Sequence, residues 1–348
     1  MKYLFYIAKN YSIPIIKPLV SYLKSTKDKF SFYVSQKVFE QFPEEWAEHK
    51  IYRELNDAIV YNPDFVITPG NFVDFRLPGI KVQIFHGLGI EKESHYKIRH
   101  FFDVYLTSGP YVTKRFNVLQ KKYKYFLIEE TGWPKIDYIL NFPTKNLKKK
   151  LNIQSGKKIV LYAPTFSSKM HSATDLLSTI PRIIKNNETW FVKFHELMNK
   201  EIVEKFKTEK PENILIIDSY DITPYLHVSD VLISDTSSVV YEFMALNKPV
   251  ITYRTQSRFD KGINIFDPGK LRVALDRSFE NPDEFQENRV KHLQEINPYI
   301  NGNISERVFE TLKDIKLNNR LPKKKKPLNM IRKCQLLYHE KFKKGYLR

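Results

Sequence analysis

The feature that most constrains the fold is the regular recurrence of short apolar runs, each ending in a small or polar turn. The first half contains KYLFYIA, FSFYVS, DFVITPG, KVQIFHG, DVYLTSG and KYFLIEETG. The second half continues with KKIVLYAPT, TWFVKFHE, NILIIDS, DVLISD and PVITY. Runs rich in Ile, Val, Phe and Tyr, separated by amphipathic stretches, predict buried strands of mostly parallel sheets joined by helices. The sequence therefore predicts an α/β fold in two halves.

The length indicates two domains, because 348 residues exceed what one core usually organises. The polar and basic segment 141–158 separates the two sets of apolar runs, so we place the boundary there. The predicted parts are an N-terminal domain at 1–145, a C-terminal domain at 157–320 and a basic tail at 321–348. Two doubly wound domains would bind ligands between them, at the carboxyl ends of their strands.

The charge of the chain calls for an anionic partner. The formal net charge is +18, and half of this excess lies in the tail, which has ten Lys or Arg and one Glu. Nucleic acid, anionic lipid and phosphorylated substrates are the candidate partners. The apolar residues mixed with these cations suit an anionic membrane surface, although a solvated basic tail has the same composition. These apolar residues are Met330, Leu336, Leu337, Tyr338, Phe342 and Leu347.

Two further patterns narrow the class of protein. No run of about 18 uncharged apolar residues occurs, so no transmembrane span is predicted. The single cysteine, Cys334, supports neither a disulfide scaffold nor a cysteine metal site, and a reducing cytoplasmic setting fits best. No pair of acids requires a metal, so no cofactor is expected, and metal dependence stays open.

Two histidines follow predicted strands in the two halves. His86 ends KVQIFH and is followed by Gly87 and Gly89, which we expect to let the backbone turn tightly. His195 occupies the same kind of position in TWFVKFHE. An imidazole at a strand end can take a proton from a hydroxyl near neutral pH, or hold a phosphate oxygen. The local sequence equally allows histidines that only satisfy neighbouring backbone groups.

The stretch ISDTSSVVYEFMALNKPVITY places an acid and three hydroxyls between a strand and a helix expected from Ser238 through Leu246. A helix N-cap explains one such oxygen, because capping side chains accept unpaired backbone amides. It does not require all four polar residues, and hydroxyls at a helix start can also hold a phosphate. Thr165 in LYAPTF can aim a hydroxyl or amide toward the same edge. Neither the P-loop pattern nor a complete dinucleotide fingerprint occurs.

Six motifs together resemble those of the CDP-glycerol glycerophosphotransferases, the enzymes that prime and polymerise teichoic acids. In order they are HGLGIEKE, GWPKID, LYAPTF, FVKFHE, DITPYLHVSDVLISDTSSVVYEFMALNKPVITY and NGNISERV. The resemblance covers about residues 81 to 310, and the stretch 221–253 is its most specific part. It implies a GT-B architecture, two Rossmann-like domains with parallel sheets facing a central cleft.

The resemblance also implies an activity and a set of site residues. A polyol phosphate moves from a CDP-activated donor to a hydroxyl of a lipid-linked or cell-surface glycopolymer, on the cytoplasmic face of the membrane. His86 corresponds to the family's catalytic histidine and His195 to its second essential one. Gly87 and Gly89 fall on the acceptor side. The expected donor-side residues are Thr165, Asp235, Thr236, Ser237, Ser238, Glu242 and Lys261.

Two alternatives remain open. The first motif reads HGLGIE where the family commonly has HGTPLK, and YAPTF lacks the Arg of YAPTWR, so the transferred group is not fixed. A GT-B glycosyltransferase using a nucleotide sugar in surface-polysaccharide synthesis would use the same kind of phosphate site. A basic nucleic-acid-binding protein would share the charge, but no recognised nucleic-acid-binding signature occurs, so no specific nucleic acid is expected as a partner.

Overall fold

The computed structural model describes residues 1–167 and 171–342, with side chains through Tyr338. The chain groups into two compact units. The first unit contains Met1–Gly87, Lys92–Tyr138 and the chain from Ile296 onward, and the second contains Leu88–Glu91 and Ile139–Glu295.

This grouping corrects the predicted division at its C-terminal side. The residues from Ile296 to 320, assigned to the second domain from sequence, belong to the first unit, as does the described part of the tail. The reason is a buried bond network over long sequence distance. The Asp137 carboxylate accepts hydrogen bonds from the backbone N–H groups of Ile304 at 3.0 Å and Ser305 at 2.7 Å. The start of a late helix is thereby tied to the first unit.

A seven-stranded sheet forms the centre of the first unit, in the order β3-β2-β1-β4-β5-β6-β7 with every pairing parallel. Its strands are β1 (Lys2–Ile7), β2 (Lys29–Val34), β3 (Ile51–Tyr52), β4 (Phe65–Thr68), β5 (Ile80–Gln83), β6 (Val104–Thr107) and β7 (Leu127–Glu130). The six strands predicted here are confirmed. The edge strand β3 was not predicted, because two half-buried residues are too short for a readable pattern.

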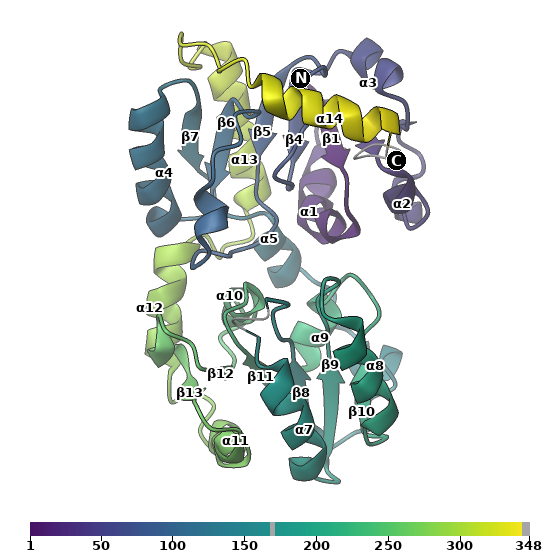
Figure 1. The fold of residues 1–348 in the computed structure, drawn as a ribbon, viewed down its shortest axis with the longest axis vertical. Helices are drawn as coiled ribbons and strands as arrows, with labels where there is room; N and C mark the ends of the chain where they lie inside the picture. The colour runs from purple at the N-terminus through teal and green to yellow at the C-terminus, as the bar shows by residue number, and fades with distance from the viewer. Residues whose placement is uncertain (168–170, 343–348) are drawn as a thin grey trace. The chain divides into compact units, whose positions relative to one another are not determined.

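Helices flank this sheet, among them α1, α4, α13 and α14 in Figure 1. The helices of the unit are α1 (Ile13–Lys24), α2 (Gln36–Phe39), α3 (Leu55–Tyr61), α4 (Pro110–Tyr123), α13 (Ile304–Leu317) and α14 (Met330–Phe342). Helix α5 (Lys135–Leu140) begins in this unit, and its last two residues belong to the second. Aromatic contacts join early and late parts of the chain. Phe309 of α13 packs against Tyr3 of β1 with ring centroids 4.8 Å apart, and stacks on Tyr22 of α1 at 5.5 Å.

The second unit has its own parallel sheet, in the order β10-β9-β8-β11-β12-β13. Its strands are β8 (Lys158–Tyr162), β9 (Glu188–Val192), β10 (Ile214–Ile216), β11 (Val231–Ser234), β12 (Val250–Tyr253) and β13 (Ile263–Ile265). The five predicted strands are confirmed, and the three-residue edge strand β13 is an addition. Four-residue strands buried on both faces, such as β11 and β12, are typical of a parallel sheet covered by helices.

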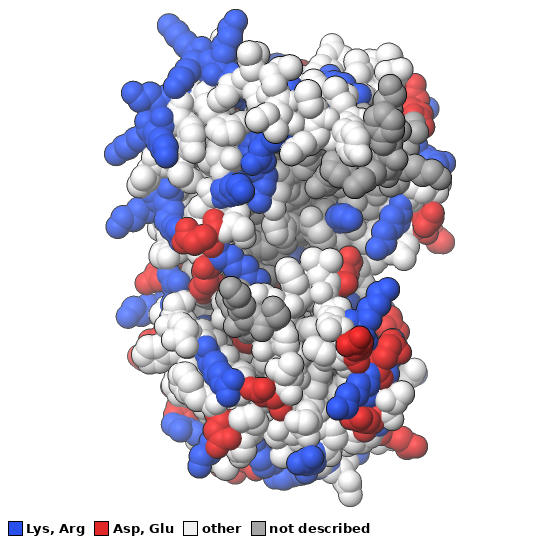
Figure 2. Space-filling model, in the orientation of Figure 1, with Lys and Arg blue, Asp and Glu red and all other residues white. Residues whose placement is uncertain are grey.

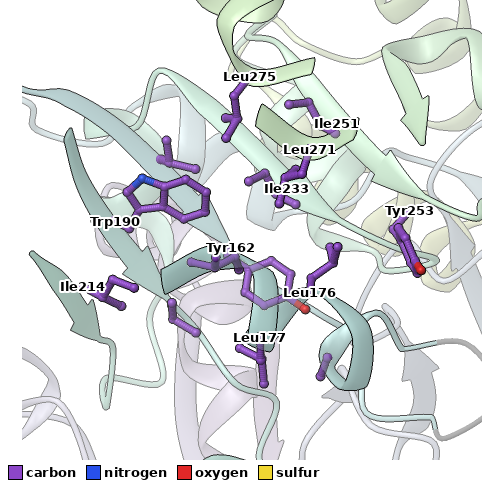
Figure 3. Close-up of a cluster of buried hydrophobic side chains, with 14 of the residues drawn as sticks. Tyr162, Leu176, Leu177, Trp190, Ile214, Ile233, Ile251, Tyr253, Leu271 and Leu275 are labelled. Atoms are coloured by element: carbon purple, nitrogen blue, oxygen red, sulfur yellow. The ribbon is translucent and has the colours of Figure 1, made fainter. Parts of the chain in front are cut away.

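One face of this second sheet carries a continuous core. Trp190 of β9 and Tyr162 of β8 pack with Leu176 of α7 and with Leu271 and Leu275 of α11, as Figure 3 shows. The helices of the unit are α6 (Leu147–Lys150), α7 (Ala173–Ile183), α8 (Lys200–Glu209), α9 (Thr223–Val228), α10 (Val239–Met244), α11 (Leu271–Glu280) and α12 (Gln286–Ile296). The buried strands hold the loops at their carboxyl ends in fixed register.

Candidate functional site

Three of the predicted site segments leave neighbouring strands at one edge of the second sheet. The adjacent strands β9, β8 and β11 are followed by His195, Thr165 and Asp235. From β8 the chain continues to β9 on one side, whereas from β11 it continues to β12 on the other. The carboxyl ends of the neighbouring strands β8 and β11 therefore form the switch point of the sheet, the place where open α/β sheets bind ligands. The three segments therefore lie at the same edge of the second sheet.

The Asp235 carboxylate holds both ends of the connection between β8 and α7 at this switch point. It is 1% exposed. Oδ1 accepts a hydrogen bond from the backbone N–H of Thr165 at 2.9 Å, and Oδ2 accepts from the backbone N–H and the hydroxyl of Ser172 at 2.8 and 2.9 Å. A carboxylate that accepts three bonds in a dry site holds its partners firmly, since leaving them unpaired is costly. Asp235 thus fixes the positions of Thr165 and Ser172.

Ser172 was missed by sequence reasoning. It is fully buried and also lies 2.9 Å, oxygen to oxygen, from the hydroxyl of Tyr162. Burial raises the pKa of Tyr162 well above its usual value, and the Asp235 charge adds to this effect. The signal for Ser172 is long-range, because it contacts Asp235 from 63 positions away, and nothing in its own neighbourhood marks it.

The three hydroxyls after Asp235 do not cap the helix. Helix α10 begins at Val239 and ends at Met244, shorter than predicted, and Ser238 at its N-cap makes no side-chain capping bond. Among the residues that the structure describes, the hydroxyls of Thr236, Ser237 and Ser238 make no hydrogen bond to the protein, and all three residues are partly exposed. The capping interpretation is therefore wrong for Ser238. Three donors at the switch point thus have no acceptor in the described part of the protein.

His195 presents a defined edge of its imidazole. Its Nδ1 accepts a hydrogen bond from the backbone N–H of Leu197 at 3.1 Å, so the neutral ring carries its proton on Nε2. The ring packs against Phe166 of the YAPTF motif with centroids 4.4 Å apart. His195 is exposed, whereas strand β9 before it is buried. The arrangement suits donation of an N–H to an anionic oxygen.

Lys261 and Glu242, two of the predicted donor-side residues, are both buried. Lys261 is 2% exposed, and its Nζ donates to the carbonyl oxygens of Arg258 at 2.8 Å and Ser257 at 3.4 Å. Burial lowers the Lys261 pKa to about 8. Its ammonium therefore holds a loop in place. Glu242 is also buried, within helix α10.

The short segment Leu88–Glu91 belongs to the second unit and begins two residues after His86. Glu91 accepts a hydrogen bond from the Tyr241 hydroxyl of α10 and lies 4.0 Å from the Arg258 guanidinium. These residues were missed by sequence reasoning, because contacts across 150 positions leave no local pattern. Among the described residues, no group of three His, Cys, Asp or Glu side chains lies close enough to hold a metal ion.

His86 of the first unit follows a strained turn. Strand β5 ends at Gln83, and Phe85 adopts a φ of 59°, a conformation that a large side chain rarely takes. The indole N–H of Trp133 donates to the Phe85 carbonyl at 3.1 Å, which fixes the turn. The chain also bends at His86 and Gly87, although neither Gly87 nor Gly89 has a positive φ. The following residue, His86, is exposed.

Other rings surround this turn. Phe85 stacks on His95 with centroids 4.7 Å apart, and the His86 ring lies 5.7 Å from that of Tyr11. Burial lowers the His95 pKa to about 3, with the His86 charge as the next cause. His95 is therefore neutral at physiological pH. His86 remains the exposed imidazole of this end of the sheet.

The GWPKID and NGNISERV motifs have a structural explanation. Trp133 holds the turn before His86, and Asp137 holds the start of α13. Gly132 has a φ of 91°, and a Cβ there would lie 2.9 Å from the Ile304 side chain. Residues of these two motifs therefore hold in place the turn before His86 and the start of α13.

Comparison with known proteins places the chain in a family. The profile described as CDP-Glycerol:Poly(glycerophosphate) glycerophosphotransferase matches residues 86–314. The teichoic acid ribitol-phosphate polymerase TarL of Staphylococcus aureus is 26% identical over 59% of this chain and 40% of its own length. A teichoic acid glycerol-phosphate primase of Bacillus spizizenii is 26% identical over 86% of this chain and 85% of its own length. The chain spans only about two fifths of the first curated relatives that it matches.

Solved structures agree on the fold. The wall teichoic acid polymerase TagF aligns with a TM-score of 0.69 at 17% identity, covering 91% of this chain and 90% of that one. A UDP-GlcNAc 2-epimerase from Neisseria meningitidis aligns with a TM-score of 0.61 at 15% identity, covering 90% of this chain and all of that one. The predicted α/β fold with two Rossmann-like, GT-B-type units is confirmed.

Proposed function

The chain belongs to the CDP-glycerol:poly(glycerophosphate) glycerophosphotransferase family, and on that premise we propose that it transfers a polyol phosphate from a CDP-activated donor to a hydroxyl of a glycopolymer. One observation carries the proposal beyond family membership. The hydroxyls of Thr236, Ser237 and Ser238 have no acceptor within the described protein and stand at the switch point of the second sheet. Donors without acceptors at that edge suit the phosphate oxygens of a nucleotide donor.

In the proposed reaction His86 and His195 have separate roles. His86 takes the proton of the acceptor hydroxyl as its oxygen attacks the phosphorus that carries the polyol. The bond from that phosphorus to the bridging oxygen breaks, and CMP leaves with the electron pair. Negative charge grows on the phosphates, where the hydroxyl groups and the Nε2–H of His195 donate hydrogen bonds. Phosphoryl transfer depends mainly on such positioning and charge stabilisation.

Donor class is tested by titrating the protein with CDP-glycerol, CDP-ribitol and a UDP-sugar. We expect both CDP-alcohols to bind more tightly than the UDP-sugar. Preferential binding of the UDP-sugar would instead support the nucleotide-sugar glycosyltransferase that the sequence also allows.

Replacing Ser237 and Ser238 together by alanine should weaken CDP-glycerol binding by roughly 10- to 100-fold, because two hydrogen bonds to charged oxygens are lost. The denaturation midpoint should stay unchanged, because these hydroxyls make no hydrogen bond with the described protein. Calorimetric titration and denaturant unfolding measure the two effects. Ser178→Ala, on the exposed side of α7, is the matched control. A double variant that unfolds more easily but binds donor normally would show that the hydroxyls are structural.

A finer part of the proposal concerns the acceptor and the place of the reaction. The acceptor is linked to a lipid, and the reaction takes place at the inner surface of the membrane. Met330, Ile331, Leu337 and Tyr338 of α14 are exposed, whereas Leu336 of the same helix is buried. Figure 2 shows Lys and Arg gathered over α4 and the segment before α14. Exposed apolar groups among cations favour an anionic lipid surface. Leu347 and the side chain of Phe342, also in the predicted apolar set, lie outside the described residues.

No described helix is long and apolar enough to span a bilayer. Sedimentation with vesicles tests the surface proposal. Binding to phosphatidylglycerol vesicles that weakens with salt is expected, and equal binding to phosphatidylcholine vesicles would contradict the electrostatic part.

A further inference from the structure

A cavity of about 390 Å³ lies within the first unit. It opens at the carboxyl ends of β1 and β4, which are neighbours in the sheet. From β1 the chain continues to β2 on one side, and from β4 it continues to β5 on the other. This is the switch point of the first sheet, the counterpart of the edge at which the proposed donor site lies. The proposed function assigns no ligand to this cavity.

The basic tail forms part of the lining of this cavity. Arg332, Gln335 and Leu336 of α14 line it together with residues that follow β1 and β4. Figure 1 shows α14 running across the sheet near these two strands. Leu336 is 5% exposed. The helix is therefore docked on the unit through its inner face, while its other apolar residues stay exposed.

The segment before α14 fixes the position of the helix. Lys326 forms an ion pair with Asp103 at 2.7 Å and donates to the Phe101 carbonyl at 3.1 Å. The side-chain amide of Asn329 donates to the carbonyl of Arg99 at 3.0 Å. Both Arg99 and Phe101 themselves line the cavity. The residues that hold the tail in place therefore also line the cavity.

The lining is cationic. Lys9, Arg99 and Arg332 contribute positive charge, and no acidic side chain is among the described lining residues. Within the described chain, the Lys9 ammonium and the Arg332 guanidinium make no ion pair or hydrogen bond. Asn71 accepts from Gln83 through Oδ1 at 2.9 Å, so its amide N–H₂ remains as a donor. Cations grouped around a cavity with no acidic side chain among its described lining residues favour an anionic ligand.

The cavity also adjoins the proposed base. Tyr11 lines it, and the Tyr11 ring lies 5.7 Å from the His86 ring. We propose that this cavity binds a phosphate or diphosphate group carried by the acceptor, with Arg332 of the tail helix as one of its ligands. The identification of the ligand as the acceptor rests on the proposed transferase function. A phosphate held here fixes the acceptor beside His86, and the exposed apolar face of α14 favours a phosphate borne by a lipid.

The test uses the full chain and inorganic pyrophosphate, with saturating CMP present to occupy the donor site. Arg332→Gln and Lys9→Gln, the second in the segment that follows β1, should each weaken pyrophosphate binding by about tenfold or more, since each removes a charged partner. Lys325→Gln, an exposed tail residue outside the cavity, is the matched control and should bind normally. Unchanged binding in both cavity variants, or equal loss in the control, would overturn the proposal.

Two further arms separate the sources of the phosphate. A lipid-borne group is indicated if Arg332→Gln weakens binding to phosphatidic acid vesicles more than binding of glycerol 3-phosphate, and a soluble group if the reverse holds. Failure of the transferase function is visible separately. A chain that binds pyrophosphate through Arg332 but binds neither CMP nor CDP-glycerol keeps the phosphate site and contradicts the proposed function.

Discussion

Replacing His86 with alanine should lower kcat by about 10²- to 10⁴-fold, the usual contribution of a general base. The side chain is exposed at the end of β5 and the turn before it is held by Trp133, so the substitution removes the imidazole without disturbing its support. The affinity for CDP-glycerol and the denaturation midpoint should therefore stay close to those of the unaltered protein. Steady-state kinetics, donor titration and denaturant unfolding measure the three quantities.

A second histidine provides the control for this prediction. His49 packs against Phe30 at the amino end of β2, with ring centroids 4.3 Å apart, and is remote from the strand ends that carry the site. His49→Ala should keep kcat within a small factor. Near-normal turnover of His86→Ala on a verified donor would remove His86 from the mechanism.

Asp235→Asn should destabilise the protein by about 3 kcal/mol and also reduce activity. Both carboxylate oxygens accept N–H groups in a buried site. An amide can accept on one side only and turns its own N–H₂ toward a donor on the other. The backbone N–H of either Thr165 or Ser172 is then left without its acceptor. Denaturant unfolding monitored in the second unit measures the loss.

Asp230→Asn is the matched control for Asp235. Its carboxylate accepts one backbone N–H, that of Ile159, at 2.7 Å, and Asp230 is exposed at the other end of the same strand. Water can replace that bond, so the cost should stay below about 1 kcal/mol. An Asp235→Asn variant as stable as this control would contradict the loop-positioning role.

Most of the architecture was readable from the sequence because it is local. Buried strands such as KIVLY and VLIS carry their pattern in a few consecutive residues. The edge strands β3 and β13 were not readable, since two or three residues define no period. The return of the chain to the first unit was also hidden, because it depends on Asp137 reaching Ser305, 168 positions away.

For the candidate site, too, the locally determined features could be predicted and the long-range ones could not. Strand-end positions predicted where His86, His195 and the SDTSS stretch lie, since they follow from strand boundaries. The roles of individual groups depend on partners distant in sequence. Asp235 bonds to Ser172 and Thr165, 63 and 70 positions away. The turn before His86 is made by Phe85, whose carbonyl accepts a hydrogen bond from Trp133. The tail was readable as basic and amphipathic, but its docking through Lys326 and Leu336 was not.

The identity of the nucleotide released is the most direct test of the central claim. The protein is supplied with CDP-glycerol, with bacterial membranes as the source of acceptor, and the products are separated by ion-exchange chromatography. Polyol-phosphate transfer breaks the bond at phosphorus and must release CMP, with glycerol phosphate appearing in the acceptor. Release of CDP, or release of UDP from a UDP-sugar with no reaction of CDP-alcohols, would contradict the account.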